Sequence, residues 1–162
     1  MRLLPLKEYQ SYFPLCLNML CDFLLEQEVL LSEKKSSDEI RTESERMLHE
    51  RLCDSNREIF LFEKGRAIVG FAEVCLEEEC FPDEDLPETC VKVLSFYIVP
   101  QARRQKLGTA FFKLIRTWGR DRKASLIEIE IPSYPIAVNQ FVAGQGLELV
   151  GSGARNCYRS FI

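Results

Sequence analysis

Residues 100–110 combine a proline, basic side chains and a glycine in a pattern that could bind a phosphorylated ligand. The first N–H groups of a helix lack intrahelical partners and carry partial positive charge, so a turn that opens a helix can direct them at a diphosphate. Arg103, Arg104 and Lys106 add positive charge, and Gly108 lets the backbone approach a ligand closely. The run reads Pro100-Gln101-Ala102-Arg103-Arg104-Gln105-Lys106-Leu107-Gly108-Thr109-Ala110.

Two glutamates stand where a carboxylate could move a proton or hold a cation. Glu130 is the last polar residue of the alternating stretch 125–131, and Glu73 lies in the otherwise apolar stretch 68–76. A carboxylate in apolar surroundings must find a partner or shift its pKa. The alternation also allows a plainer interpretation, in which Glu73, Glu128 and Glu130 lie on solvated sheet faces.

Composition excludes several classes of protein. The net charge is −4, which argues against a protein that grips nucleic acid by its phosphates. No apolar run reaches eighteen residues, so no membrane span is expected. The seven cysteines are odd in number, irregularly spaced and without a C-x-x-C pair, so we expect no metal site and no disulfide framework. Reduced thiols favour a cytoplasmic location.

The elements that must position these residues follow from hydrophobic period. Strands are expected at 1–6, 58–63, 66–76, 91–99 and 125–131, with a final pair at 148–150 and 157–162. Helices are expected at 7–31, from a cap at Asp38 to 53, at 107–122 and at 135–144. The stretch 91–99 is almost wholly apolar, which is typical of a central strand covered on both faces. The pattern indicates one mixed α/β domain.

At residues 100–110 the sequence resembles the GNAT superfamily of acetyl-CoA-dependent N-acetyltransferases. Its motif is a hydrophobic strand, a proline and then Arg/Gln-x-x-Gly-x-Gly/Ala at a helix start. Arg103 matches the first motif position and Gly108 the last, whereas Lys106 replaces the middle glycine. The resemblance extends over essentially all 162 residues because the order of elements also agrees. It implies a single domain, 1–162, with the α/β (α+β) GNAT fold: a central mixed, mostly antiparallel sheet flanked by helices, with a V-shaped opening between the strands at 91–99 and 125–131.

The resemblance also implies a cosubstrate, acetyl-CoA. The residues implicated in binding the CoA pyrophosphate are Arg103, Arg104, Gln105, Lys106, Leu107, Gly108 and Thr109. Backbone groups of Tyr97, Ile98 and Val99 would bind the pantetheine arm, and Asn139 would hydrogen-bond the pantetheine or the thioester. Glu130 and Glu73 are the catalytic candidates, because the acceptor ammonium must lose a proton to a carboxylate or to water held by one.

Two residues common in the family are missing. The strand at 91–99 has no acid, and Val142 stands where many members carry a tyrosine general acid. Tyr134, Tyr158 and Cys157 are conceivable substitutes. A thiol with a pKa near about 8.5 also leaves with less help than an alkoxide, so activity does not require a dedicated acid.

A narrower resemblance is to bacterial aminoglycoside 6'-N-acetyltransferases, through stretches 68–73, 96–100, 116–119 and 146–159. It implies transfer of an acetyl group to a primary amine of a small cationic acceptor, aminoglycoside-like or polyamine-like. In the wider family the counterpart of the acidic loop 77–88 often forms a wall of the acceptor site, and the alternative is a solvated loop without that role. Two alternatives stay open: acetylation of a protein N-terminus or lysine, and a non-catalytic acyl-CoA-binding module. We expect a cytoplasmic monomer or homodimer without nucleic-acid or membrane partners.

Overall fold

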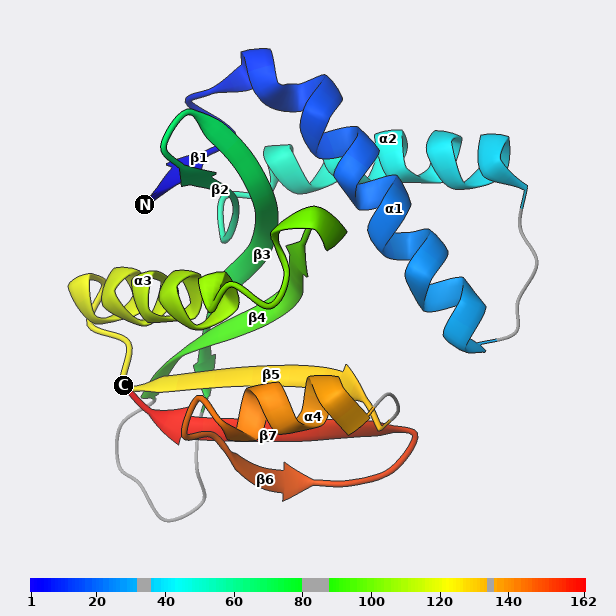
Figure 1. Ribbon diagram of the computed structural model, residues 1–162. Coiled ribbons are helices and arrows are strands. Elements are labelled where there is room, and N and C mark those ends of the chain that lie inside the picture. The colour runs from blue at the N-terminus through cyan, green and yellow to red at the C-terminus, as the bar shows by residue number, and fades with distance from the viewer. Residues whose placement is uncertain (32–35, 80–87, 134–135) are drawn as a thin grey trace. The chain divides into compact units, whose positions relative to one another are not determined.

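The computed structural model describes residues 1–31, 36–79, 88–133 and 136–162 (Figure 1). Across these residues the strands follow the order β1-β2-β3-β4-β5-β7-β6, and the sheet is mostly antiparallel. In chain order the elements are β1 (Arg2–Pro5), the 3-10 turn η1 (Gln10–Tyr12), α1 (Phe13–Leu31), α2 (Ser37–Cys53), β2 (Arg57–Lys64), β3 (Ala67–Glu79), β4 (Glu88–Ile98), η2 (Pro100–Ala102), α3 (Leu107–Asp121), β5 (Leu126–Pro132), α4 (Ile136–Ala143), β6 (Glu148–Gly151) and β7 (Arg155–Phe161).

The chain divides into two compact units that share the long strands β3 and β4. The first comprises Met1–Glu73 with Ser95–Arg104, and the second Val74–Leu94 with Gln105–Ile162. Both shared strands therefore begin in one unit and end in the other. The family-like order of elements agrees with the sequence prediction of a mixed α/β fold.

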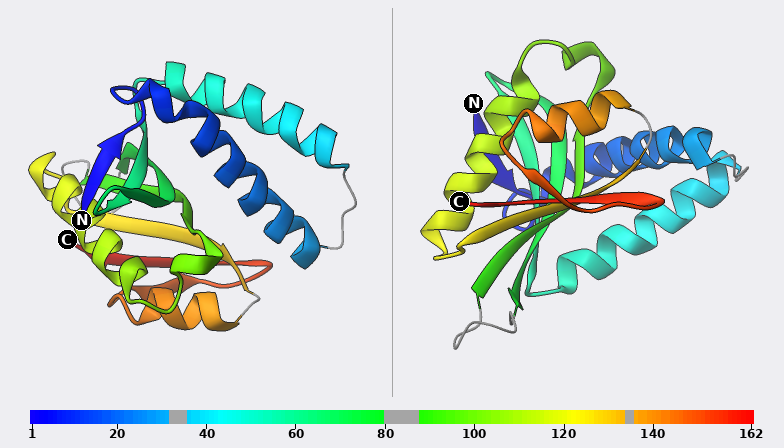
Figure 2. Two further views of the ribbon diagram at one scale, coloured as in Figure 1. Left: turned by 45° about the horizontal axis from the view of Figure 1, so that its top comes forward. Right: turned by 90° about the horizontal axis from the view of Figure 1, so that it is seen from below.

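The first unit packs α1 and α2 with strands β1 and β2 and with parts of β3 and β4. In both views of Figure 2, α1 and α2 lie side by side. The apolar face of α1 meets residues of the strands in one buried cluster, because the side chains of α1 recur at helical spacing. The fully buried members include Leu6, Leu20, Leu48, Leu61 and Phe71.

The start of α2 differs from the sequence prediction. Ser36, not Asp38, is the N-cap residue, and it forms a capping box with Glu39. The Ser36 side chain accepts from the Glu39 N–H while the Glu39 carboxylate accepts from the Ser36 N–H, which satisfies two donors at once. Asp38 lies in the first helical turn, where its charge still interacts favourably with the helix dipole.

In the second unit, β5 is the strand around which the sheet is built. It pairs in parallel with β4, from Cys90 opposite Leu126 to Val93 opposite Ile129, and antiparallel with β7 along its whole length. The edge strand β6 then pairs with β7. The β4–β5 ladder ends at Val93 and Ile129, although β5 itself continues to Pro132.

Helices α3 and α4 cover one face of this sheet. Gly119 of α3 lies so close to β4 that an added Cβ would be 2.6 Å from a methyl carbon of Val91, so a larger residue would force a neighbouring side chain to move. Figure 2 shows α4 over β5, β6 and β7. The apolar residues of β5 face these helices, with Ile127, Ile129 and Ile131 all buried. The alternate residues Glu128 and Glu130 therefore lie on the other face.

Candidate functional site

The turn between β4 and α3 contains two non-glycine residues with left-handed backbone conformation. The chain leaves β4 through η2, which begins with Pro100, and Arg104 and Lys106 then have φ of 62° and 60°. Lys106 stands at the N-cap of α3 and is the residue that replaces the middle glycine of the motif. A glycine there would adopt this conformation without steric cost, whereas for other residues it costs about 1 kcal/mol or more. Lys106 therefore has the left-handed backbone conformation that accounts for a glycine at this position of the family motif.

The first turn of α3 has the chemistry of an anion site. Among the described residues, no side chain caps this helix and no acidic residue lies in its first turn. The N–H groups of Leu107, Gly108 and Thr109 precede the first intrahelical bond, which Ala110 donates to Lys106. With the positive end of the helix dipole, these groups suit a diphosphate.

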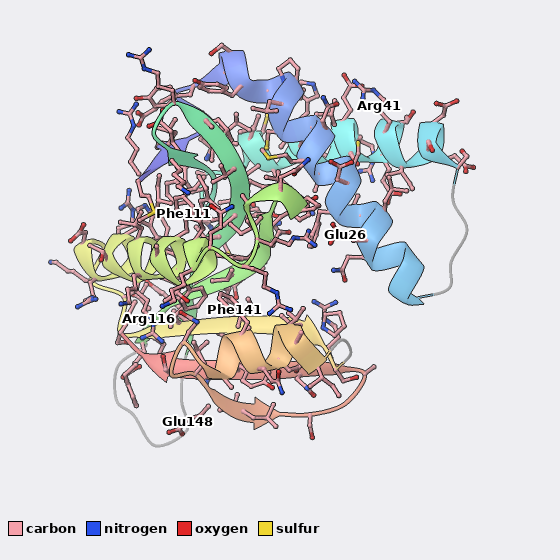
Figure 3. The ribbon with its side chains drawn as sticks, in the orientation of Figure 1. Glu26, Arg41, Phe111, Arg116, Phe141 and Glu148 are labelled. Carbon is pink, nitrogen blue, oxygen red and sulfur yellow. The ribbon has the colours of Figure 1, made fainter. Side chains whose placement is uncertain are left out.

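Arg103 is engaged within the first unit. Its guanidinium binds both carboxylate oxygens of Glu26 on α1, which Figure 3 labels, at 2.6 and 2.9 Å. It also donates to the Ile98 carbonyl at 2.7 Å. It also lies over the ring of Tyr97, with its central carbon 5.3 Å from the ring centroid. Arg103 therefore ties the turn to α1, and its charge is largely balanced by Glu26. Sequence reasoning missed Glu26, because nothing in the pattern of α1 marks it.

The end of β4, with Tyr97, Ile98 and Val99, is packed against β3. The Val99 N–H donates to the Val69 carbonyl at 3.0 Å. Gly70 faces the Tyr97 carbonyl so closely that a Cβ there would be 2.2 Å from the oxygen. Burial, followed by the charges of Glu26 and Asp22, raises the pKa of Tyr97 to about 12, so its hydroxyl stays protonated at neutral pH.

Glu73 is fully enclosed in the first unit. Its side chain is 1% exposed. The carboxylate forms ion pairs with Arg51 at 2.7 Å and Arg57 at 2.8 Å, and it accepts a hydrogen bond from the Ser95 hydroxyl at 3.3 Å. Asp54 binds the other side of Arg57 at 3.0 Å. We call Glu73, Arg51, Arg57 and Ser95 the Glu73 cluster. It satisfies the need for partners that the apolar sequence around Glu73 predicts, and it joins α2, β2, β3 and β4.

Glu128 and Glu130 lie on the face of the second unit's sheet that points away from α3 and α4. Glu128 is 8% exposed and accepts two hydrogen bonds from Arg159, one of them at 2.9 Å. Lys92 approaches its other oxygen at 3.9 Å and binds Glu77 at 2.8 Å. We call Glu128, Arg159 and Lys92 the Glu128 cluster. These three residues are direct neighbours in the ladder of β4, β5 and β7.

Glu130 is the more accessible of the two carboxylates, with a side chain 60% exposed. Its nearest cation is Arg155, at 3.5 Å. A hollow of about 250 Å³ lies here, lined by Lys92, Val93, Leu94, Glu128, Glu130 and Arg155. The structure therefore brings Glu128 and Glu130 to one hollow, and it buries Glu73 elsewhere within the first unit.

Cys157 is opposite Glu130 in the ladder between β5 and β7. Burial, and then the negative charge of Glu128, raises the pKa of this thiol to about 11. Cys157 is thus a weaker acid than an ordinary alkyl thiol, whose pKa is near about 8.5. It is a poor proton donor to a departing thiolate.

Asn139 of α4 is held by several neighbours. Its amide nitrogen donates to the carbonyls of Pro132 and Ser133 at 3.1 Å, and its oxygen accepts from Asn156 at 2.7 Å and from the Tyr158 hydroxyl at 3.1 Å. It anchors α4 to the end of β5 and to β7. Tyr158 is 7% exposed and its proton is directed at Asn139. Tyr134, and residues 80–87 of the acidic loop, lie outside the described residues.

Similarity to known proteins decides the family. The family model for Acetyltransferase (GNAT) family matches residues 18–146, which is most of the chain and spans both units. The chain belongs to the GNAT acetyltransferase family. It is therefore an acyltransferase, and membership implies acyl-CoA-dependent acetyl transfer. No curated protein matches the sequence significantly.

Solved structures show the same GNAT fold at low sequence identity. The PaiA N-acetyltransferase of Thermoplasma acidophilum, solved in complex with coenzyme A, has a TM-score of 0.76 and 10% identity, with 100% of both chains covered. An acetyltransferase from Thermus thermophilus has a TM-score of 0.69 and 17% identity over 99% of this chain and 96% of that one. A transcriptional regulator from Bacillus halodurans C-125 has a TM-score of 0.72 and 16% identity over 94% and 97%.

Neither a group of metal ligands nor a membrane-spanning helix occurs in the described ranges. In those ranges no group of three or more His, Cys, Asp or Glu side chains could hold a metal ion. Within the same residues, the helices fall short of the length and hydropathy that a membrane span needs.

Proposed function

We propose that this GNAT enzyme transfers the acetyl group of acetyl-CoA to a primary amine of a small cationic acceptor. We further propose that the Glu130 carboxylate binds the ammonium group of this acceptor and takes its proton. The observation that carries the proposal is the hollow that Glu130 and Glu128 line on the face of the sheet that points away from α3 and α4. An exposed carboxylate attracts an ammonium group through charge-assisted hydrogen bonds. It can also take the proton that the amine must lose before it attacks a thioester, directly or through one water.

The neighbours of Glu130 support a division of labour between the two carboxylates. Arg159 and Lys92 hold Glu128 in place, so its charge is already compensated. In the described part of the chain Glu130 has a single longer ion pair, to Arg155, and most of its side chain is accessible. A cationic acceptor can therefore displace Arg155 from Glu130 at small cost, since exposed ion pairs contribute only about 0–1 kcal/mol.

The cosubstrate is proposed to bind at the turn between β4 and α3. Acetyl-CoA would supply the activated acetyl group and a thiolate leaving group. The N–H groups of Leu107, Gly108 and Thr109 would hold its diphosphate, with the backbone of Arg104, Gln105 and Lys106 and the positive charges beside them. The first helical turn fits this role because, among the described residues, it has neither a capping side chain nor an acidic residue. Arg103 would keep the turn in place through Glu26.

The chemistry supports release of the thiolate without a dedicated acid. Tyr97 and Cys157, whose pKa values are raised to about 12 and about 11, are both weaker acids than a CoA thiol near about 8.5. Tyr158 directs its proton at Asn139. Solvent is then sufficient to protonate the thiolate.

The test is turnover with a panel of amines. Acetyl-CoA is mixed with spermidine, a kanamycin-type aminoglycoside or a lysine peptide, and release of the CoA thiol is followed. We expect turnover with the small polycations and little with the peptide. Efficient turnover confined to the peptide would favour the protein-acetylating alternative, and CoA binding without turnover on any amine would favour a non-catalytic module.

The variant Glu130→Gln tests the assigned carboxylate. We expect kcat/KM for the amine to fall about 100-fold, which is the lower range for loss of a general base. Glu148→Gln, at an exposed position on β6, removes the same charge and should leave kcat/KM unchanged. Unaltered turnover in Glu130→Gln would exclude Glu130 as the base.

A further inference from the structure

A second hollow, of about 570 Å³, runs along α3 in the second unit. It is lined by residues of one face of α3 together with two residues that follow α4: Thr109, Phe112, Lys113, Arg116, Thr117, Arg120, Gly144 and Gln145. Residues 109, 113, 116 and 120 recur at the three- and four-residue spacing that places side chains on one side of a helix. From Thr109 to Arg120 the hollow follows α3 for about 16 Å.

Three cations of the described chain face this hollow without a neutralising acid. Within the described residues, neither Lys113 nor Arg120 has an ion pair, and both are exposed. Arg116 also lacks an acidic partner in those ranges. Like charges at such spacing destabilise a helix by about a few tenths of a kcal/mol each, so the arrangement is unfavourable by itself. An anion bound in the hollow would offset that cost.

Arg116 is a fixed part of the hollow. Its guanidinium donates to the Gln145 carbonyl at 3.0 Å and to the Ser160 hydroxyl at 2.9 Å, and it lies 5.7 Å from the centroid of the Phe112 ring (Figure 3). Burial and then the charge of Arg120 lower its pKa, although an arginine stays charged at neutral pH. The hollow thus has a rigid positive base, with Lys113 and Arg120 on either side of it along the helix.

The hollow adjoins the turn at which the CoA diphosphate is proposed to bind, and this position suggests its ligand. Thr109 lines it and also belongs to the first turn of α3, where the CoA diphosphate is proposed to bind. In coenzyme A the next anionic group after the diphosphate is the 3′-phosphate of the adjoining ribose. We propose that Lys113 and Arg120, on a base formed by Arg116, bind this 3′-phosphate and so select CoA over its dephosphorylated form.

This inference rests on the proposed binding of CoA at the turn. It goes beyond that proposal, because the diphosphate is common to CoA and dephospho-CoA and would not distinguish them. The 3′-phosphate carries up to two negative charges near neutral pH. Its attraction to the lysine and arginine side chains should therefore decrease as salt concentration rises.

The test is binding, measured by isothermal titration calorimetry with CoA and with dephospho-CoA. We expect the wild-type chain to bind CoA about tenfold more tightly at low salt, which corresponds to about 1.4 kcal/mol. In Lys113→Gln/Arg120→Gln that ratio should fall to about one, while the affinity for dephospho-CoA stays the same. Glutamine is a good helix former, so α3 is retained.

The matched control is Arg66→Gln/Lys123→Gln, which removes the same total charge at two exposed positions outside the hollow. It should keep the tenfold preference. Equal binding of the two ligands by the wild type would overturn the inference and leave CoA binding at the turn intact. Binding of neither would overturn both.

Discussion

The Glu73 cluster and the Glu128 cluster contain the same residue types but differ in how accessible their carboxylates are. Each contains a largely buried glutamate on a strand, at least one arginine from another element and a nearby cysteine. In the first, both carboxylate oxygens are occupied by arginines and a serine hydroxyl donates a further hydrogen bond. In the second, the glutamate borders a hollow in which another carboxylate, Glu130, stays exposed.

The difference is one of access rather than composition. The Glu73 cluster joins four elements and encloses its carboxylate, so we propose that its role is to hold the first unit together. The Glu128 cluster lies across three strands on a face that the helices of its unit do not cover. The role of a carboxylate that the sequence marks as a candidate thus depends on how the folded chain packs around it. We propose that Glu73 positions β3 and β4, and that proton transfer depends on Glu130.

The largest effect is expected when the Glu73 cluster is broken. Glu73→Gln leaves Arg51 and Arg57 without their shared carboxylate, and loss of one partner from a buried ion pair costs about 3–5 kcal/mol. We expect the free energy of unfolding in urea to fall by about 3 kcal/mol, at the lower end of that range, since Arg57 keeps Asp54. Glu45→Gln, exposed on α2, should change it by less than about 0.5 kcal/mol. A similar small loss in Glu73→Gln would contradict the structural role.

A smaller effect is expected from Glu128→Gln. The side chain of Arg159 is 25% exposed and that of Lys92 is 27% exposed, so water replaces part of what the carboxylate provides. Unfolding in urea should show a loss of about 1–2 kcal/mol. A loss as large as that of Glu73→Gln would mean that the two clusters do not differ in their contribution to stability.

Ser95→Ala tests how much an uncharged partner contributes to the Glu73 cluster. The hydroxyl donates to Glu73 at 3.3 Å, and the two arginines remain in place without it. We expect a loss of about 1 kcal/mol in the free energy of unfolding, the usual net value of one hydrogen bond. No loss would show that the arginines alone satisfy the carboxylate.

The effect that is smallest at neutral pH concerns the two cysteines, because it appears only in alkali. Burial raises the pKa of Cys16 to about 12 and that of Cys157 to about 11. The folded chain holds these protons more tightly than the unfolded one, so stability should fall as pH rises above about 9. The fall for Cys157 should be complete by about pH 11, and that for Cys16 by about pH 12. In Cys16→Ala and Cys157→Ala, unfolding at a series of pH values should show a shallower decline.

The elements are predictable from sequence because local patterns determine them. The strict alternation at 125–131 and the apolar run at 91–99 give β5 and β4, and α3 begins at Leu107 as predicted. The sequence prediction puts the cap of α2 two residues late, because Asp38 and Ser36 are both good N-cap residues and only the capping box decides between them.

The partners of the candidate residues are not predictable in the same way. Arg51 and Arg57 approach Glu73 only once α2 and β2 are packed, and Arg159 meets Glu128 only through the register of β7. Nothing local marks Glu26 as the partner of Arg103. The spacing of Lys113, Arg116 and Arg120 is visible in the sequence, and a search for cations at helical intervals would have found it.

The end of α2 has a practical consequence for experiments. Among the described cysteines, Cys53 is the exposed one, and it is two residues beyond Arg51 of the Glu73 cluster. Cys16 is buried, and its raised pKa makes it unreactive to thiol reagents near neutral pH. A fluorescent probe attached to Cys53 would therefore sit next to the buried ion cluster without replacing any of its members. It would give a spectroscopic signal for loosening of the first unit while acetyl transfer is measured separately.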